Sequence, residues 1–96
     1  MDLDSIVKSL ESLNPAKVIL FGSYAYGTPH KDSDIDLLII MDTDKNFHQR
    51  VQQVRPLLPA SKAIDLIVLT PAEYQKAKGS NLLVAEIESR GKVIYG

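Results

Sequence analysis

Two short motifs carry the residues of this chain that are best suited to chemistry. Gly22-Ser23 precedes Asp34-Ile35-Asp36 by ten intervening residues, and a third acid, Asp65, lies inside the later apolar run 63–69. Glycine lets a backbone approach a phosphate closely, and serine adds a hydroxyl donor. Carboxylates are the hard oxygen ligands that Mg²⁺ takes, usually together with substrate phosphates. The motifs therefore predict a site for a nucleoside triphosphate and magnesium.

Asp34 and Asp36 lie two positions apart at the start of an expected strand. Side chains alternate between the faces of a strand, so both carboxylates should point to one face while Ile35 points into the core. Two like charges so close raise each other's pKa unless a cation lies between them. An isolated Asp-x-Asp is more often a solvated strand end. The glycine–serine pair upstream is what favours a metal site here.

Gly22 follows an apolar run and opens a turn. The first amides of a helical turn lack internal partners and favour an anion. By itself, a glycine followed by serine is more often a structural turn with a capping residue. Residues 22–28 lack the Gly-Lys-Ser/Thr ending of a P-loop, and Gly22 and Gly27 alone do not make a Rossmann fingerprint. Lys31, between the two motifs, is a candidate phosphate contact.

Asp65 lies between Ile64 and Leu66 in a strand that the sequence predicts to be buried. An unpaired ionised carboxylate in such a place would cost several kcal/mol. Three explanations remain open: the group is protonated, it is paired with a base such as Lys17 or Arg55, or it faces the same metal site as the other two acids. The third is favoured because perturbed buried acids cluster at functional sites.

Other metal sites are less favoured by the sequence. Residues 32–36 resemble the start of an EF-hand loop, but Leu37 stands where that loop needs glycine and Thr43 where it needs glutamate. His30 and His48 are isolated, whereas metal-binding histidines come in clusters of defined spacing.

Composition limits the class of protein. The 96 residues are expected to form one domain, 1–96, and the net charge of −1 argues against a general nucleic-acid binder. There is no cysteine, so neither a disulfide nor a thiolate site is available. The acidic N-terminus does not resemble a signal peptide, and no apolar run approaches the ~20 residues that cross a bilayer. A cytoplasmic protein without membrane contact is expected.

Alternating helical and strand patterns must position these motifs. Apolar residues at spacings of three and four predict a first helix over 3–13, which Asn14-Pro15 ends. Thr70-Pro71 with Glu73 predicts a helix start, and Ser80 is expected to cap the next helix, which runs to Arg90. The remaining expected elements are strands over 17–21, 35–41, 63–69 and 92–95, a helical turn over 23–27 and a helix within 44–58. Strand 35–41 is apolar on both faces, which requires cover on both sides. This order predicts an α/β or α+β fold with a mixed sheet of about four strands.

Phe21-Gly22-Ser23, Asp34-Ile35-Asp36 and Ile64-Asp65-Leu66 together resemble the signature of the DNA polymerase β-type nucleotidyltransferases. The resemblance covers nearly the whole chain, and the short length is similar to the minimal nucleotidyltransferases, the MntA-like antitoxins. It implies the nucleotidyltransferase fold, with Asp34 and Asp36 binding two Mg²⁺ ions (Mn²⁺ being possible) and the triphosphate. It also implies that Asp65 shares the metal nearest the acceptor and helps to deprotonate its hydroxyl, while Gly22 and Ser23 hold the phosphates.

The same resemblance implies a partner. The expected activity is transfer of AMP from ATP to a hydroxyl, with tyrosine the expected acceptor, on a HEPN-domain toxin that the chain would neutralise. The expected elements use all 96 residues, so the acceptor should come from another macromolecule. A homodimer and a hetero-oligomer both remain open.

One departure from the family pattern bears on activity. Family members often carry arginines in the turn after Gly-Ser, whereas this chain has Tyr24 and Tyr26. Tyrosine does not supply the positive charge that arginine offers a triphosphate. Two rival hypotheses follow: a module of the same fold that neutralises its partner by contact alone, and a nucleotide-binding sensor without transfer.

Overall fold

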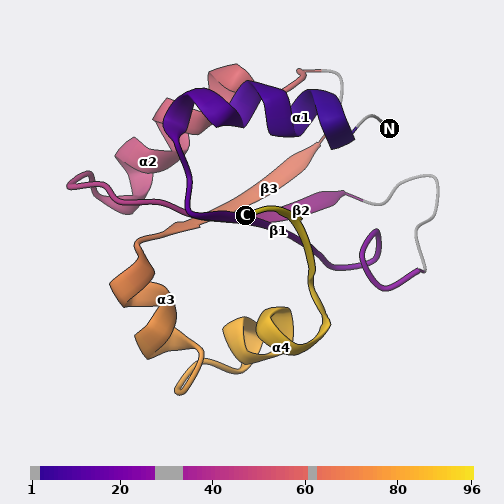
Figure 1. The fold of residues 1–96 in the computed structure, drawn as a ribbon, viewed down its shortest axis with the longest axis vertical. Coiled ribbons are helices and arrows are strands. Elements are labelled where there is room, and N and C mark those ends of the chain that lie inside the picture. Colours follow the sequence, from indigo (N-terminus) through magenta and orange to yellow (C-terminus); the bar gives the residue numbers. More distant parts are fainter. Residues whose placement is uncertain (1–2, 28–33, 61–62) are drawn as a thin grey trace.

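The computed structural model describes residues 3–27, 34–60 and 63–96, which form one four-stranded sheet between two layers of helices (Figure 1). One layer holds α1 (Leu3–Leu10), which continues as η1 (Glu11–Leu13), and α2 (Phe47–Val54), which continues as η2 (Arg55–Leu57). The other layer holds α3 (Pro71–Ala77) and α4 (Leu82–Arg90). The strands are β1 (Lys17–Phe21), β2 (Ile35–Ile40), β3 (Ile64–Leu69) and β4 (Lys92–Tyr95). The predicted fold class is confirmed.

The sheet is mixed, with the strand order β3-β2-β1-β4. β1 pairs antiparallel with β2 and with β4, whereas β2 and β3 run parallel. The end of β1 therefore lies beside the starts of β2 and β3. This topology brings the glycine–serine turn and the strand ends that carry the acids to the same end of the sheet, at the right of Figure 1.

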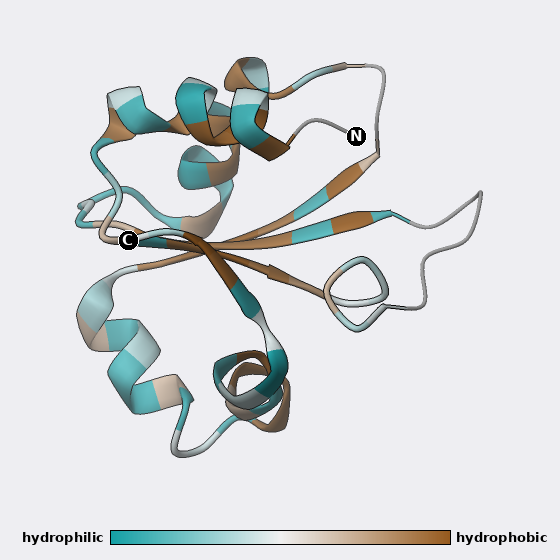
Figure 2. Ribbon diagram, turned by 45° about the vertical axis from the view of Figure 1, so that its right-hand side comes forward, coloured by the Kyte–Doolittle hydropathy of each residue, from teal (hydrophilic) through white to brown (hydrophobic). Residues whose placement is uncertain are grey.

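Apolar side chains fill both faces of the sheet, as the pattern of β2 predicted. Ile35, Leu37 and Ile39 belong to the cluster beneath α1 and α2, while Leu38 and Ile40 belong to the cluster on the α3 and α4 side. Figure 2 shows the strands as largely hydrophobic bands between helices that mix hydrophilic and hydrophobic residues. Each fully buried leucine or isoleucine contributes roughly 1.5–3 kcal/mol relative to an exposed one, so β2 anchors the fold.

Helix ends follow local chemistry, with two corrections to the sequence-based expectations. Thr70 and Glu73 form the predicted capping box of α3. The helix expected within 44–58 is shorter, because Asn46 starts α2 through a capping box with Gln49 and the last residues tighten into η2. The expected Ser80 cap is wrong: Asn81 accepts a hydrogen bond from the amide of Val84 and begins α4, while the Ser80 hydroxyl donates to the Lys76 carbonyl.

Arg50 ties one helical layer to the other around the edge of the sheet. Its side chain is buried and donates to the carbonyls of Lys45 and Val68 at 2.7 and 3.0 Å. It also binds both carboxylate oxygens of Glu73, at 2.7 and 3.3 Å. Because Glu73 lies in the first turn of α3 and Arg50 lies on α2, this ion pair links elements on opposite faces. No motif in the sequence marks Arg50 for this role.

Among the residues that the structure describes, no helix has the length and apolar character needed to cross a membrane.

Candidate active site

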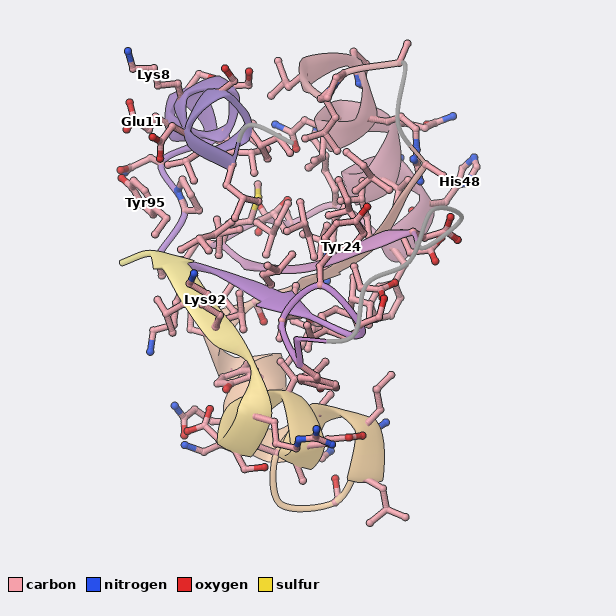
Figure 3. The ribbon with its side chains drawn as sticks, turned by 90° about the vertical axis from the view of Figure 1, so that its right-hand side faces the viewer. Lys8, Glu11, Tyr24, His48, Lys92 and Tyr95 are labelled. Atoms are coloured by element: carbon pink, nitrogen blue, oxygen red, sulfur yellow. The ribbon has the colours of Figure 1, made fainter. Side chains whose placement is uncertain are left out.

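The turn after β1 wraps tightly around Gly22. The amides of Ala25 and Tyr26 both donate to the Gly22 carbonyl, at 3.0 and 3.1 Å, which closes the short helical turn expected over 23–27. Gly22 itself has a φ of +74°, a conformation that favours glycine. Ser23 is half-buried in this turn. Figure 3 views the molecule from this end, with the turn toward the viewer and Tyr24 labelled on it.

Asp36 lies directly against this glycine. The antiparallel pairing of β1 and β2 places Asp36 opposite Phe21. A Cβ built on Gly22 would collide with the Oδ2 oxygen of Asp36. The absence of a side chain at Gly22 is therefore what lets the carboxylate lie beside the turn.

Asp36 and Asp65 are direct neighbours in the parallel register of β2 and β3. Both lie on the face of the sheet that α3 and α4 cover further along, since Leu38 and Ile67 belong to the cluster on that side. Burial raises the pKa of Asp36 first, and then the charge of Asp65, a hydrogen bond with the Asp65 side chain and the charge of Asp34 raise it further. Asp34 and Asp65 are thus both close enough to raise the pKa of Asp36.

The donor set has the chemistry that a divalent cation requires. Mutual repulsion among three carboxylates is relieved by a hard cation, and Mg²⁺ takes oxygen ligands of this kind. Within residues 3–27, 34–60 and 63–96, however, no three acidic or histidine side chains are grouped tightly enough to hold a metal ion together. Asp36 and Asp65 make the close contact. Asp34 is exposed directly before the first residue of β2, and its charge acts on Asp36 at longer range.

The expected burial of Asp65 is wrong. β3 is an edge strand, and its second residue is exposed because the helices of that layer cover only the later part of the strand. The cost of burying this charge therefore does not arise. The two suggested bases do not pair with it either: Arg55 donates to the Ile64 carbonyl at 2.8 Å, and Lys17 lies opposite Ile40 at the far end of β1.

The other residues considered from the sequence are a lysine, two histidines and the two tyrosines of the turn. Lys31 and His30 lie outside the described residues. His48 is exposed on α2, as expected of an isolated surface histidine. Tyr24 and Tyr26 are partly buried and pack in opposite directions, Tyr24 against the cluster of α1 and α2 and Tyr26 against that of α3 and α4.

Arg90, which the sequence pattern marks only as a helix end, lies near the site. Its guanidinium lies over the ring of Tyr26, with the Cζ atom 4.0 Å from the ring centroid. It also pairs with Glu86 one helical turn earlier, at 3.1 Å. A basic residue just before the glycine that ends α4 was the available signal, but its contact with the turn depends on the packing of α4 against the sheet.

A groove of about 480 Å³ lies further along β3 on the α3 and α4 side. Its walls include Phe47, Ile67, Leu69, Leu83 and Val84, and none of the three acids lines it. The acids therefore lie at the end of the sheet rather than in this apolar groove.

Comparison with known proteins agrees with the fold. A family model described as a nucleotidyltransferase domain matches residues 3–95. The protein adenylyltransferase MntA of Shewanella oneidensis is 30% identical over 80 residues, which are 82% of this chain and 52% of that protein. The chain thus spans about half the length of this relative.

Two solved structures cover the whole chain. A crystal structure of a toxin–antitoxin with AMP-PNP aligns with a TM-score of 0.71 and 28% identity, over 100% of this chain and 74% of the other. A structure of the toxin–antitoxin MntA-HpeT, in which two aspartates two positions apart are replaced by glutamate, aligns with a TM-score of 0.68 and 27% identity, over the same shares. The resemblance seen in the motifs is confirmed. The chain therefore belongs to the nucleotidyltransferase domain family.

Proposed function

We propose that this chain is a magnesium-dependent nucleotidyltransferase that moves AMP from ATP to a hydroxyl of a partner protein. The observation that carries the proposal is the register of Asp36 with Asp65, with the Asp36 carboxylate seated against Gly22. Acidic side chains from two strands beside a glycine turn support a site for a metal ion and phosphates. Asp34, Asp36 and Asp65 would hold two Mg²⁺ ions, or Mn²⁺, while Gly22 and Ser23, with Lys31, would contact the phosphates.

The reaction is an in-line displacement at the α-phosphorus. The acceptor oxygen forms a bond to that phosphorus, the bond to the bridging oxygen toward the β-phosphorus breaks, and pyrophosphate leaves. The acceptor proton passes to Asp65, which is exposed and can be reached by a protein substrate. When bound, the two metal ions would neutralise charge that develops on the attacking and leaving oxygens.

The partner is proposed to be a HEPN-domain toxin, with a tyrosine hydroxyl as the acceptor and this chain as its antitoxin. Support comes from the relative that is named a protein adenylyltransferase and from the toxin–antitoxin structures with the same fold. The two aspartates replaced in one of those structures have the spacing of Asp34 and Asp36. We place the reaction in the cytoplasm, where ATP is available. The assembly is proposed to be a hetero-oligomer with the partner or a homodimer of the chain.

The test is transfer of label from α-labelled ATP. The full chain, magnesium and a candidate HEPN-domain partner are incubated beside the variant Asp34→Asn/Asp36→Asn. Label on the partner only with the unmodified chain supports the proposal, and replacing the acceptor tyrosine with phenylalanine should remove it. Stabilisation by ATP and magnesium without any transfer would instead indicate a nucleotide sensor.

A second candidate is neutralisation of the partner by contact alone. It is favoured by the lack of a tight three-ligand metal group among the described side chains and by the tyrosines in the turn. In that case a complex would form without label on the partner, and the Asp34→Asn/Asp36→Asn variant would bind the partner with unchanged affinity.

A further inference from the structure

We propose that Arg90 is a phosphate-binding residue of this site, held over the nucleotide turn by Tyr26. The inference rests on the proposed function, because it assumes that the site takes a nucleoside triphosphate. It assigns to the end of α4 a role that the motifs of the family do not contain.

The contact between Arg90 and Tyr26 brings a cation to the turn. The guanidinium carbon lies 4.0 Å from the centre of the Tyr26 ring. The amide of Tyr26 donates to the Gly22 carbonyl at 3.1 Å, and Gly22 touches the Asp36 carboxylate. One chain of contacts therefore connects Arg90 to the acid that the metal would bind.

The backbone that carries Arg90 is fixed relative to the same strand. Gly91 follows Arg90, and its amide donates to the Ile87 carbonyl at 2.8 Å. A Cβ at Gly91 would lie 2.6 Å from a methyl carbon of Ile19, so the end of α4 packs closely on β1. Since β1 leads directly into the turn, the position of Arg90 relative to the turn is set by the core and not by its side chain alone.

The turn itself, residues 23–27, supplies no positive charge for a triphosphate, and Arg90 could supply it. Tyr24 and Tyr26 carry no charge to balance a triphosphate, and the nearby carboxylates are negative. Arginine offers planar, paired donors that fit phosphate oxygens and stacks readily on aromatic rings. The Arg90 side chain is 56% exposed. Its Nη1 donates to Glu86 at 3.1 Å, and the remaining donors of the guanidinium are the ones that a phosphate would take.

A simpler explanation is that Arg90 only stabilises its helix. A cation in the last turn favours the helix dipole, and the Glu86 pair at 3.1 Å is a common surface contact. Both explanations predict the observed geometry. They differ in whether removing the charge changes the affinity for phosphates.

The experiment compares binding of AMP-PNP and AMP, each with magnesium, by the full chain and by four variants. Arg90→Gln is expected to weaken AMP-PNP binding about tenfold, the scale of one exposed charge-assisted contact, and AMP binding by less than about twofold. Arg90→Lys should recover part of the loss. Tyr26→Phe, which keeps the ring, should bind as the unmodified chain does, whereas Tyr26→Leu should lose about threefold.

Lys78→Gln is the matched control. Lys78 also lies over an aromatic ring, that of Tyr74 at 5.9 Å, but it is the residue that follows α3, away from the turn. Its removal should leave both affinities unchanged, and thermal unfolding should show every variant folded. Equal AMP-PNP affinity in Arg90→Gln and the unmodified chain, or an equal loss for both ligands, would overturn the role of Arg90 alone. No binding of AMP-PNP by the unmodified chain would overturn the proposed function, and this inference with it.

Discussion

The Asp36 carboxylate occupies the space beside Gly22 that a side chain at position 22 would need. Gly22 has a φ of +74°, and a Cβ there would collide with the Asp36 carboxylate. Gly22 of the first motif thus determines where the Asp36 carboxylate of the second motif lies. Sequence separation hides this relationship, because ten residues stand between the motifs while the β1–β2 pairing brings them together.

Replacing Gly22 with alanine should abolish binding of ATP with magnesium. The positive φ costs about 1 kcal/mol of folding free energy, and the new methyl group displaces the Asp36 carboxylate. Gly27→Ala is the matched control, because Gly27 has a φ of +78° with nothing within 4 Å of its Cβ position. Both variants should lose similar stability in urea unfolding, but only Gly22→Ala should lose nucleotide binding in calorimetry. Equal nucleotide binding by the two would contradict the role of this contact.

Asp65→Asn should separate transfer from binding. If Asp65 takes the acceptor proton, transfer of label to the partner should fall by about 100-fold or more. Binding of ATP with magnesium should change by no more than about threefold, because Asp34 and Asp36 keep the nucleotide. Asp36→Asn is the comparison and should lose both. A variant of Asp65 that loses nucleotide binding to the same extent would show that the three acids act as one ligand group.

Asp36→Asn should stabilise the metal-free protein at neutral pH. Burial and the neighbouring acids raise the pKa of Asp36 above its ordinary value of 3.8. The folded protein therefore favours the protonated form of Asp36. The stability that this group contributes is fully present below the pKa that Asp36 has in the unfolded chain. It is lost as the pH rises through the higher pKa that Asp36 has in the folded protein. Asparagine resembles the neutral form, so Tm in EDTA should be a few degrees higher at neutral pH.

The difference between Asp36→Asn and the unmodified chain should shrink as the pH falls toward about 4. Magnesium should raise the Tm of the unmodified chain and leave that of the variant unchanged. A lower Tm for the variant in EDTA at neutral pH would mean that the Asp36 carboxylate is not repelled by its neighbours.

Arg50→Ala should destabilise the fold by about 3 kcal/mol, since it removes a buried cation that holds Glu73 and two carbonyls. Urea unfolding measures this directly. Arg90→Gln, which breaks only an exposed pair on one helix, should cost less than about 0.5 kcal/mol. Similar costs for the two substitutions would show that Arg50 does not hold the helical layers together.

Glu73→Gln should weaken the protein at neutral pH and make no difference in strong acid. A hydrogen bond from Arg50 holds the pKa of Glu73 below its usual value, with further lowering by the Thr70 amide. Such a group contributes stability above the unfolded pKa and loses it as the pH falls through the folded pKa. Acid unfolding followed by circular dichroism should therefore show the two proteins converge at low pH. A gap that persists in strong acid would point to lost packing instead of lost charge.

Local patterns predicted most of the elements and missed some of their boundaries. The boundaries of β1 and β4 and the Thr70–Glu73 cap follow from residues near in sequence. The start of α4 was misplaced by one residue, because Ser80 and Asn81 are both good capping residues. The Ser80 hydroxyl instead makes a local hydrogen bond to the Lys76 carbonyl, four residues earlier, and the Asn81 side chain accepts from the amide of Val84.

The sequence by itself indicated the family, through the resemblance of its motifs, and a mixed sheet, through its alternating helical and strand patterns, which are local properties. It also supplied the three candidate acids. Only the tertiary structure decided that Asp65 is exposed, that Asp36 touches Gly22 and that Arg90 lies over Tyr26. These facts depend on the order of strands in the sheet and on the docking of α4 against β1. Neither follows from periodicity. The apolar pattern of a strand does not show which strands lie beside it in the sheet, or whether helices cover its whole length.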